Sequence, residues 1–225
     1  MKDLLMSSYV KKQRMMVLFG FLTLLFVIGE YFLGVASDTA TFTKIVECAA
    51  GILLIYAPEI LNKLFNLKFA NFIVYFFWFF IWLAIFLGTC FHFMTLIPLW
   101  DKLLHLISPM LLTMIGFGIL SEFLKRRSLE ELSPWLFLIF GFSFAGICGV
   151  FWEFWEWSWD TLLDMNLQRY RSGEVVFAGQ RALQDTMGDL LINVVGSLIF
   201  SIFAWVRSRN YPMYFAKFRI EFLDN

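Results

Sequence analysis

The sequence GVFWEFWEWSWD, from Gly149 to Asp160, decides which kind of fold the chain adopts. It ends a long apolar run, yet it carries the three carboxylates Glu153, Glu156 and Asp160 between four tryptophans. Spacings of three and four residues place these carboxylates on one face of a helix. Charged groups on the packed face of a membrane helix usually mark a functional site. The stretch therefore predicts a membrane helix with a polar site near one end.

The composition of the whole chain agrees with this prediction. Of the 225 residues, 60% are hydrophobic and only 16% are charged, against roughly 25% charged in soluble domains. Apolar runs of about 20 residues, long enough to cross the hydrocarbon core, recur along the sequence. We predict an all-α fold, a polytopic bundle of about six transmembrane helices in the lipid bilayer. We expect no nucleic-acid partner.

Six spans follow from the apolar runs and the turn residues between them. They cover about 16–36, 45–64, 69–94, 101–124, 134–160 and 186–206, with an outer loop at 161–185. Ser133 and Pro134 predict the start of the fifth span, because serine is a favoured N-cap and proline fits the first helical position. Pro58 predicts a kink or an early end in the second. Residues 34–36 imitate a signal-peptidase site, but the run before them is long for a signal peptide. We expect a retained first helix and one transmembrane domain over residues 1–225.

The basic residues predict the orientation of the bundle. The N-terminus, the C-terminus and the loops at 62–68 and 122–131 hold 13 of the 18 lysines and arginines. The positive-inside rule therefore places both termini in the cytoplasm. The opposite side has eleven acidic residues against five basic ones, a balance that attracts cations or the cationic parts of a substrate.

Polar side chains from three spans fall at one depth. At a rise of about 1.5 Å per residue, His105, Glu153 and Asp189 lie about 27–30 Å from the inner ends of their helices. The hydrocarbon core is about 30 Å thick, so all three lie near its outer boundary. The small residues Gly141 and Ala145 precede Glu153 on one face and allow another helix to approach closely. We expect the three spans to form one site.

The candidate residues of this site have three roles. The catalytic candidates are Glu153, Glu156, Asp189 and His105. The candidates for substrate binding are Asp101, Asn193, Arg169 and Arg181. A divalent cation (Mg, Ca, Mn or Zn) would have the candidate ligands His105, Glu153, Glu156, Asp185 and Asp189, because oxygen-rich sets with one histidine suit all four metals.

Each candidate also has a structural explanation. Asp185 could be the N-cap of the last span, and Asp189 could favour the positive end of that helix. Asp101 could pair with its neighbour Lys102, and His105 could be an ordinary buried histidine. Asp160 could be a solvated or capping residue. The arginines of the outer loop could bind anionic groups or neutralise the acidic side.

Three classes of function remain open. An enzyme acting on a lipid or lipid-linked head group would use the cluster for metal binding or acid–base chemistry. A transporter would use the same acids for protons or cations, although no inverted repeat is visible. A scaffold or resistance factor would use them to hold helices together. No metalloprotease, nucleophile-elbow, P-loop or dinucleotide motif is present, so a serine-hydrolase mechanism has no support.

Three motifs together resemble a known family. They are WDKLLH at 100–105, WEFWE at 152–156, and DTMGD at 185–189 followed by Asn193 and Gly196. They resemble the bacterial inner-membrane family typified by YjdF, whose function is uncharacterised, over roughly residues 95–200. They are more distantly similar to VanZ-like proteins, although the outer loop is longer here and the spacing of the acids does not clearly match. The resemblance implies a multi-pass protein of the bacterial cytoplasmic membrane. The VanZ-like proteins imply a lipid-linked envelope precursor as a partner, without indicating a reaction.

Overall fold

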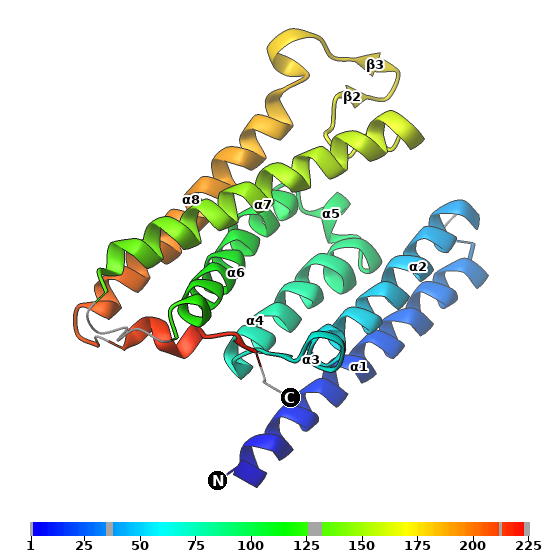
Figure 1. Ribbon diagram of the computed structural model, residues 1–225. Helices are drawn as coiled ribbons and strands as arrows, with labels where there is room; N and C mark the ends of the chain where they lie inside the picture. The colour runs from blue at the N-terminus through cyan, green and yellow to red at the C-terminus, as the bar shows by residue number, and fades with distance from the viewer. Residues whose placement is uncertain (1, 35–37, 126–131, 212, 223–225) are drawn as a thin grey trace. The chain divides into compact units, whose positions relative to one another are not determined.

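The computed structural model describes residues 2–34, 38–125, 132–211 and 213–222, and most of these lie in helices (Figure 1). Contacts group the chain into two compact units. Unit 1 comprises residues 1–104 and 220–225, and unit 2 comprises residues 105–219. The boundary falls within helix α6 (Trp100–Phe123), which begins in unit 1 and continues through unit 2.

Unit 1 is a group of helices with one short strand pair. The elements are α1 (Lys2–Phe32), α2 (Asp38–Ile55), α3 (Ala57–Phe65), α4 (Asn71–Ile81), the π-helix η1 (Trp82–Cys90), α5 (Phe93–Leu96), β1 (Leu67–Lys68) and β4 (Glu221–Phe222). Helices α1 and α2 run side by side (Figure 1) and both contact η1. The core of the unit includes the buried residues Val27, Cys48 and Phe86. Strands β1 and β4 pair antiparallel.

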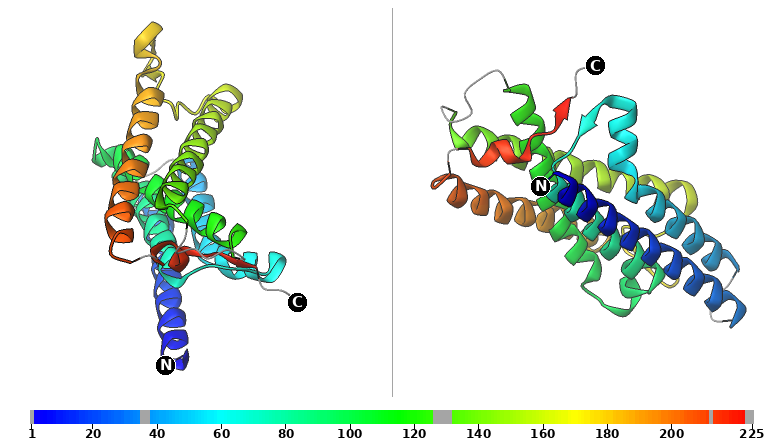
Figure 2. Two further views of the ribbon diagram at one scale, coloured as in Figure 1. Left: turned by 60° about the vertical axis from the view of Figure 1, so that its left-hand side comes forward. Right: turned by 90° about the horizontal axis from the view of Figure 1, so that it is seen from below.

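The second predicted span is bent where proline predicts it. Helix α2 ends at Ile55, and α3 has Pro58 in its first turn. The two helices differ in direction by 55°, and α3 leaves the line of α2 in Figure 2. Proline has no N–H to donate to the carbonyl four residues earlier, so the helix cannot continue straight. The predicted kink is confirmed.

Unit 2 is built on three long helices. Its elements are the greater part of α6, α7 (Pro134–Leu163), α8 (Gln184–Ser208), the strands β2 (Arg171–Ser172) and β3 (Val175–Val176), and the 3-10 helices η3 (Gly179–Arg181) and η4 (Tyr214–Phe218). The β2–β3 hairpin lies in the connection between α7 and α8 (Figure 1). The Ser133 side chain accepts a hydrogen bond from the backbone N–H of Trp135, and Pro134 follows it as the first helical residue. Both confirm the predicted start of this helix.

Small residues bring the helices of unit 2 close together. A Cβ atom on Gly141 would overlap the ring of Phe117 on α6. A Cβ atom on Gly149 would overlap the side-chain amide of Asn193 on α8. Ala145, between these glycines, is fully buried. The predicted small-residue face of α7 is therefore a helix contact surface.

The helices match a membrane protein in length and composition. Within the described residues, five helices pass as candidate spans: Ser8–Phe32, Asn71–Cys90, Trp100–Phe123, Pro134–Leu163 and Gln184–Ser208. The bent pair Thr41–Ile55 and Ala57–Phe65 makes a sixth if it is one span. The all-α bundle of about six membrane helices is confirmed. Parts of two predicted features lie outside the described residues: residues 35 and 36 of the imitated signal-peptidase site, and residues 126–131 of one basic loop. The orientation of the termini and the single domain stay predictions.

Candidate functional site

The candidate site begins where α6 and α8 meet in unit 2. The Nε2 atom of His105 lies 3.8 Å from the Oδ1 atom of Asp189, whose side chain is 1% exposed. Asp101 precedes His105 by one turn of the same helix, with a carboxylate oxygen within 4.8 Å of a ring nitrogen of His105. Asp101 also lies 3.5 Å from Lys102. The imidazole of His105 and the carboxylate of Asp189 are thus close together where α6 and α8 meet within unit 2.

Glu153 brings a third carboxylate from α7. It is 4% exposed, which agrees with its predicted inward direction. The side chains of Gln168 and Thr186, which hydrogen-bond to each other at 2.8 Å, and the carboxylates of Asp185 and Asp189 lie near it. Among the described residues, its Oε2 atom has no hydrogen-bond partner. A buried carboxylate oxygen without a partner is costly, because the lost hydration is not replaced.

Asn193 lies one turn beyond Asp189 on the same face of α8. It is 4% exposed, and its Nδ2 atom donates a hydrogen bond of 3.4 Å to the carbonyl oxygen of Ala145. This contact holds α7 and α8 together just below Glu153. The side-chain oxygen of Asn193 can accept a further hydrogen bond from a ligand or an ordered water.

Two predicted acids of α7 already have partners. The Oε1 atom of Glu156 accepts a hydrogen bond of 2.9 Å from the indole of Trp152. The carboxylate of Asp160 accepts hydrogen bonds from the backbone N–H groups of Leu167 and Gln168, at 2.5 and 2.9 Å. Asp160 therefore fixes the loop that follows α7, which agrees with the capping role considered for it.

Two ion pairs and a cation–π contact hold the outer loop, one ion pair to α8 and the other to the residue that follows α7. Arg169 lies 3.7 Å from Asp185 on α8, and the guanidinium of Arg181 lies 3.9 Å from the ring centre of Phe177. Asp164 accepts a hydrogen bond from the Tyr170 hydroxyl and pairs with Arg171 at 2.9 Å. The hydrogen bond from Tyr170 and the ion pair hold the pKa of Asp164 below its ordinary value.

The proposed N-cap role of Asp185 is wrong. The N-cap residue of α8 is Leu183, which makes no side-chain capping hydrogen bond, and Asp185 lies within the first turn. The helix starts two residues before the predicted start of the span. The Asp185 carboxylate instead lies 3.7 Å from the guanidinium of Arg169.

Unit 1 contains a second polar cluster, which the sequence pattern did not predict. The Oε1 atom of Glu30 lies 2.7 Å from Nε2 of His92, and its Oε2 atom accepts a hydrogen bond of 3.1 Å from Lys44. Lys44 also lies 3.1 Å from Nε2 of His92. His92 has a left-handed backbone conformation, with φ of 64°, at the residue before α5. The one hint in the sequence is that Glu30 and Lys44 are charged residues at the ends of apolar runs.

The unit 2 cluster has the chemistry of a cation site. The imidazole of His105 and the carboxylate of Asp189 lie 3.8 Å apart on α6 and α8, and the carboxylates of Asp185 and Asp189 are close enough to Glu153 on α7 for their charges to act on it. Buried carboxylates repel one another unless a cation or a shared proton lies between them. A divalent metal bound here would polarise a substrate oxygen, and a carboxylate could move a proton.

The long apolar helices and the buried polar groups between them define a multi-pass integral membrane protein. The family described as "Predicted membrane protein (DUF2238)" matches residues 15–210. The match covers most of the chain, and the chain belongs to this family. No curated protein and no solved structure shows significant similarity to it.

Proposed function

We propose that the cluster formed by His105, Glu153 and Asp189 binds a divalent cation and acts on the head group of a lipid or lipid-linked envelope substrate. The observation that carries this proposal is the buried Oε2 atom of Glu153, which has no hydrogen-bond partner in the described chain. It lies beside two further carboxylates. A cation at this point would offset both the desolvation and the repulsion.

Each residue has a definite role in this proposal. His105 and Asp189 hold the cation from α6 and α8, and Glu153 completes the set from α7. Asn193 orients a carboxylate or a substrate oxygen from the next turn of α8. The bound cation supplies Lewis acidity at a phosphoryl or carbonyl oxygen. Glu153 or Asp189 takes up and returns the proton.

The substrate class follows from where the cluster lies. All three residues sit in helices that are long and apolar enough to span a bilayer, so a substrate must bring its reactive group to the membrane. The resemblance to the YjdF type and to VanZ-like proteins supports an envelope lipid in the bacterial cytoplasmic membrane. The positive-inside rule supports cytoplasmic termini, and with them a cluster at the outer leaflet.

A non-catalytic scaffold is the second candidate, and one set of contacts favours it. Asp160 holds the backbone of the outer loop, and Arg169 pairs with Asp185. Both contacts tie acidic side chains of unit 2 to the outer loop, as a structural network would. In a scaffold, Glu153 and Asp189 would complete the same structural network.

Metal analysis separates the two functions. The purified protein is compared with Glu153→Gln and Asp189→Asn, and with Glu174→Gln as a control in the exposed part of the loop. We expect near-stoichiometric metal in the wild type and the control, and loss of metal in both site variants while they stay folded. Head-group release from envelope lipids, followed by mass spectrometry, should depend on the same two residues. Folded variants that all lack metal, like the wild type, would support the scaffold.

A further inference from the structure

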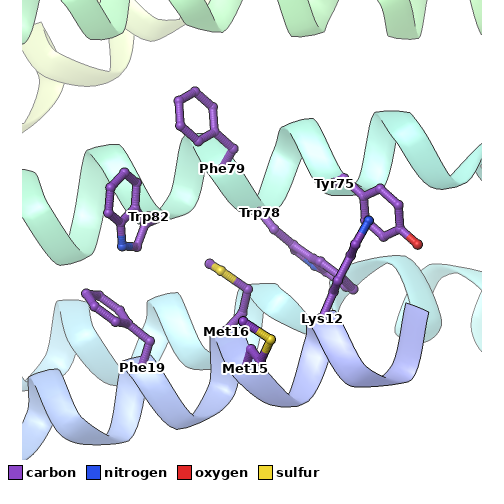
Figure 3. A pocket seen from close by; sticks show the side chains of 8 residues that line it. All are labelled: Lys12, Met15, Met16, Phe19, Tyr75, Trp78, Phe79 and Trp82. Carbon is purple, nitrogen blue, oxygen red and sulfur yellow. The ribbon is translucent and has the colours of Figure 1, made fainter. Parts of the chain in front are cut away.

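Unit 1 contains a groove that the proposed function does not use. It lies between α1 and the continuous α4–η1 helix and has a volume of about 430 Å³. Met15, Met16 and Phe19 line it from α1, and Trp78, Phe79 and Trp82 line it from the other side (Figure 3). Met15 and Phe79 are 61% and 44% exposed, so the groove is open along its length.

One end of the groove is charged. Lys12 and Tyr75 lie together at that end, and Phe19 and Trp82 lie at the other (Figure 3). The Nζ atom of Lys12 is 3.9 Å from the ring centre of Tyr75. In the described part of the chain, Lys12 has no ion-pair partner. The lysine therefore offers positive charge next to an apolar, aromatic channel.

We propose that this groove binds an acyl chain of an anionic membrane lipid, with the lipid phosphate at Lys12. The site lies wholly in unit 1 and is independent of the cation cluster. The groove walls belong to two candidate membrane spans, so the medium around them is lipid. Only an amphipathic molecule with a negative head and an apolar tail matches a channel that is basic at one end and apolar beyond it.

The charge at one end of the groove favours an anionic lipid over a helix from a second copy. A phosphate at Lys12 would pair with a lysine that has no ion-pair partner in the described part of the chain, whereas a second copy would have to supply a carboxylate at that point. From Lys12 to Phe19 is seven residues, about 10 Å along α1, a length that part of an extended acyl chain can span between the aromatic rings.

Lipid binding can be tested by native mass spectrometry of the full chain released from nanodiscs of mixed phosphatidylglycerol and phosphatidylcholine. We expect the wild type to retain one phosphatidylglycerol, with a preference of about fivefold over phosphatidylcholine for one lysine near a lipid head. Lys12→Gln should remove that preference. Lys11→Gln removes the same charge from an exposed position outside the groove and should leave it unchanged. Met15→Trp, at the exposed edge, should fill the groove and reduce retention of both lipids.

Three results would overturn the proposal. One is a wild type that retains no lipid. Another is an equal loss of preference in the Lys11 and Lys12 variants, which would mean attraction to the basic segment in general. The third is a wild type that leaves the nanodisc as a dimer and becomes monomeric on Met15→Trp, which would assign the groove to a second copy. Equal unfolding temperatures of the variants, measured in parallel, confirm that each is folded.

Discussion

Replacing Gly196 by alanine tests the close contact between α6 and α8. A Cβ atom at this position would overlap the carbonyl oxygen of Leu106 and lie 2.7 Å from Cγ of Pro109. Ordinary contacts of a Cβ atom begin at about 3.4 Å, so the two helices must separate by roughly 1 Å. A backbone carbonyl and a proline ring cannot rotate away as a flexible side chain can.

The magnitude follows from this geometry. Overpacking usually costs about 1–3 kcal/mol, and the rigid neighbours of Gly196 place this variant in the upper half of that range. Gly146→Ala is a matched control on α7, because a Cβ atom there has no neighbour within 4 Å. Alanine is the better helix former by about 1 kcal/mol, so the control should be as stable as the wild type or more stable. The same gain in helix propensity applies to Gly196→Ala and cancels in the comparison, so we expect the two variants to differ by about 2–3 kcal/mol in the free energy of unfolding.

The assay is denaturant unfolding in detergent micelles, followed by tryptophan fluorescence. Asp189 lies two turns before Gly196 on α8, so separation of the helices should also move it away from His105 and weaken cation binding. Gly146→Ala should leave cation binding unchanged. If the two alanine variants differ by less than about 0.5 kcal/mol, the range of ordinary surface substitutions, the close approach of α6 and α8 is wrong.

Three further predictions concern the other polar contacts. Asp160→Ala removes the carboxylate that accepts two backbone N–H hydrogen bonds from the outer loop. It should lower the free energy of unfolding by about 1–3 kcal/mol and speed hydrogen exchange in residues 165–172. Unchanged exchange would contradict this role. Lys44→Met removes one of the two partners of Glu30 and leaves its carboxylate with His92 alone. The change should cost about 1–3 kcal/mol, most of which a second change, Glu30→Leu, should recover in the same unfolding assay. The pKa of Asp164 is below its ordinary value in the folded chain. Its pair with Arg171 should therefore stabilise the loop above about pH 4, and this stabilisation should be lost as the pH falls through the folded pKa. Hydrogen exchange of the β2–β3 hairpin should report the loss, and Asp164→Asn should abolish the pH dependence.

Local chemistry explains why so much of the helical fold could be predicted. Span length depends on the thickness of the hydrocarbon core, and the apolar runs show it directly. Pro58 and the Ser133–Pro134 pair act on the backbone within one turn, so the bend and the helix start follow from neighbouring residues. The depth of His105, Glu153 and Asp189 follows from counting residues along straight helices.

By itself, therefore, the sequence determined the class of fold and the approximate spans, and it predicted a set of polar groups at one level. Only the tertiary structure decided which of these groups share partners. It separated Asp160, which holds a loop, from Glu153, which has a buried oxygen without a partner. It also joined Glu30 to His92, which is 62 residues away along the chain. Spacing along a helix determines the face on which a side chain lies, but its partner depends on helix contacts between residues distant in sequence.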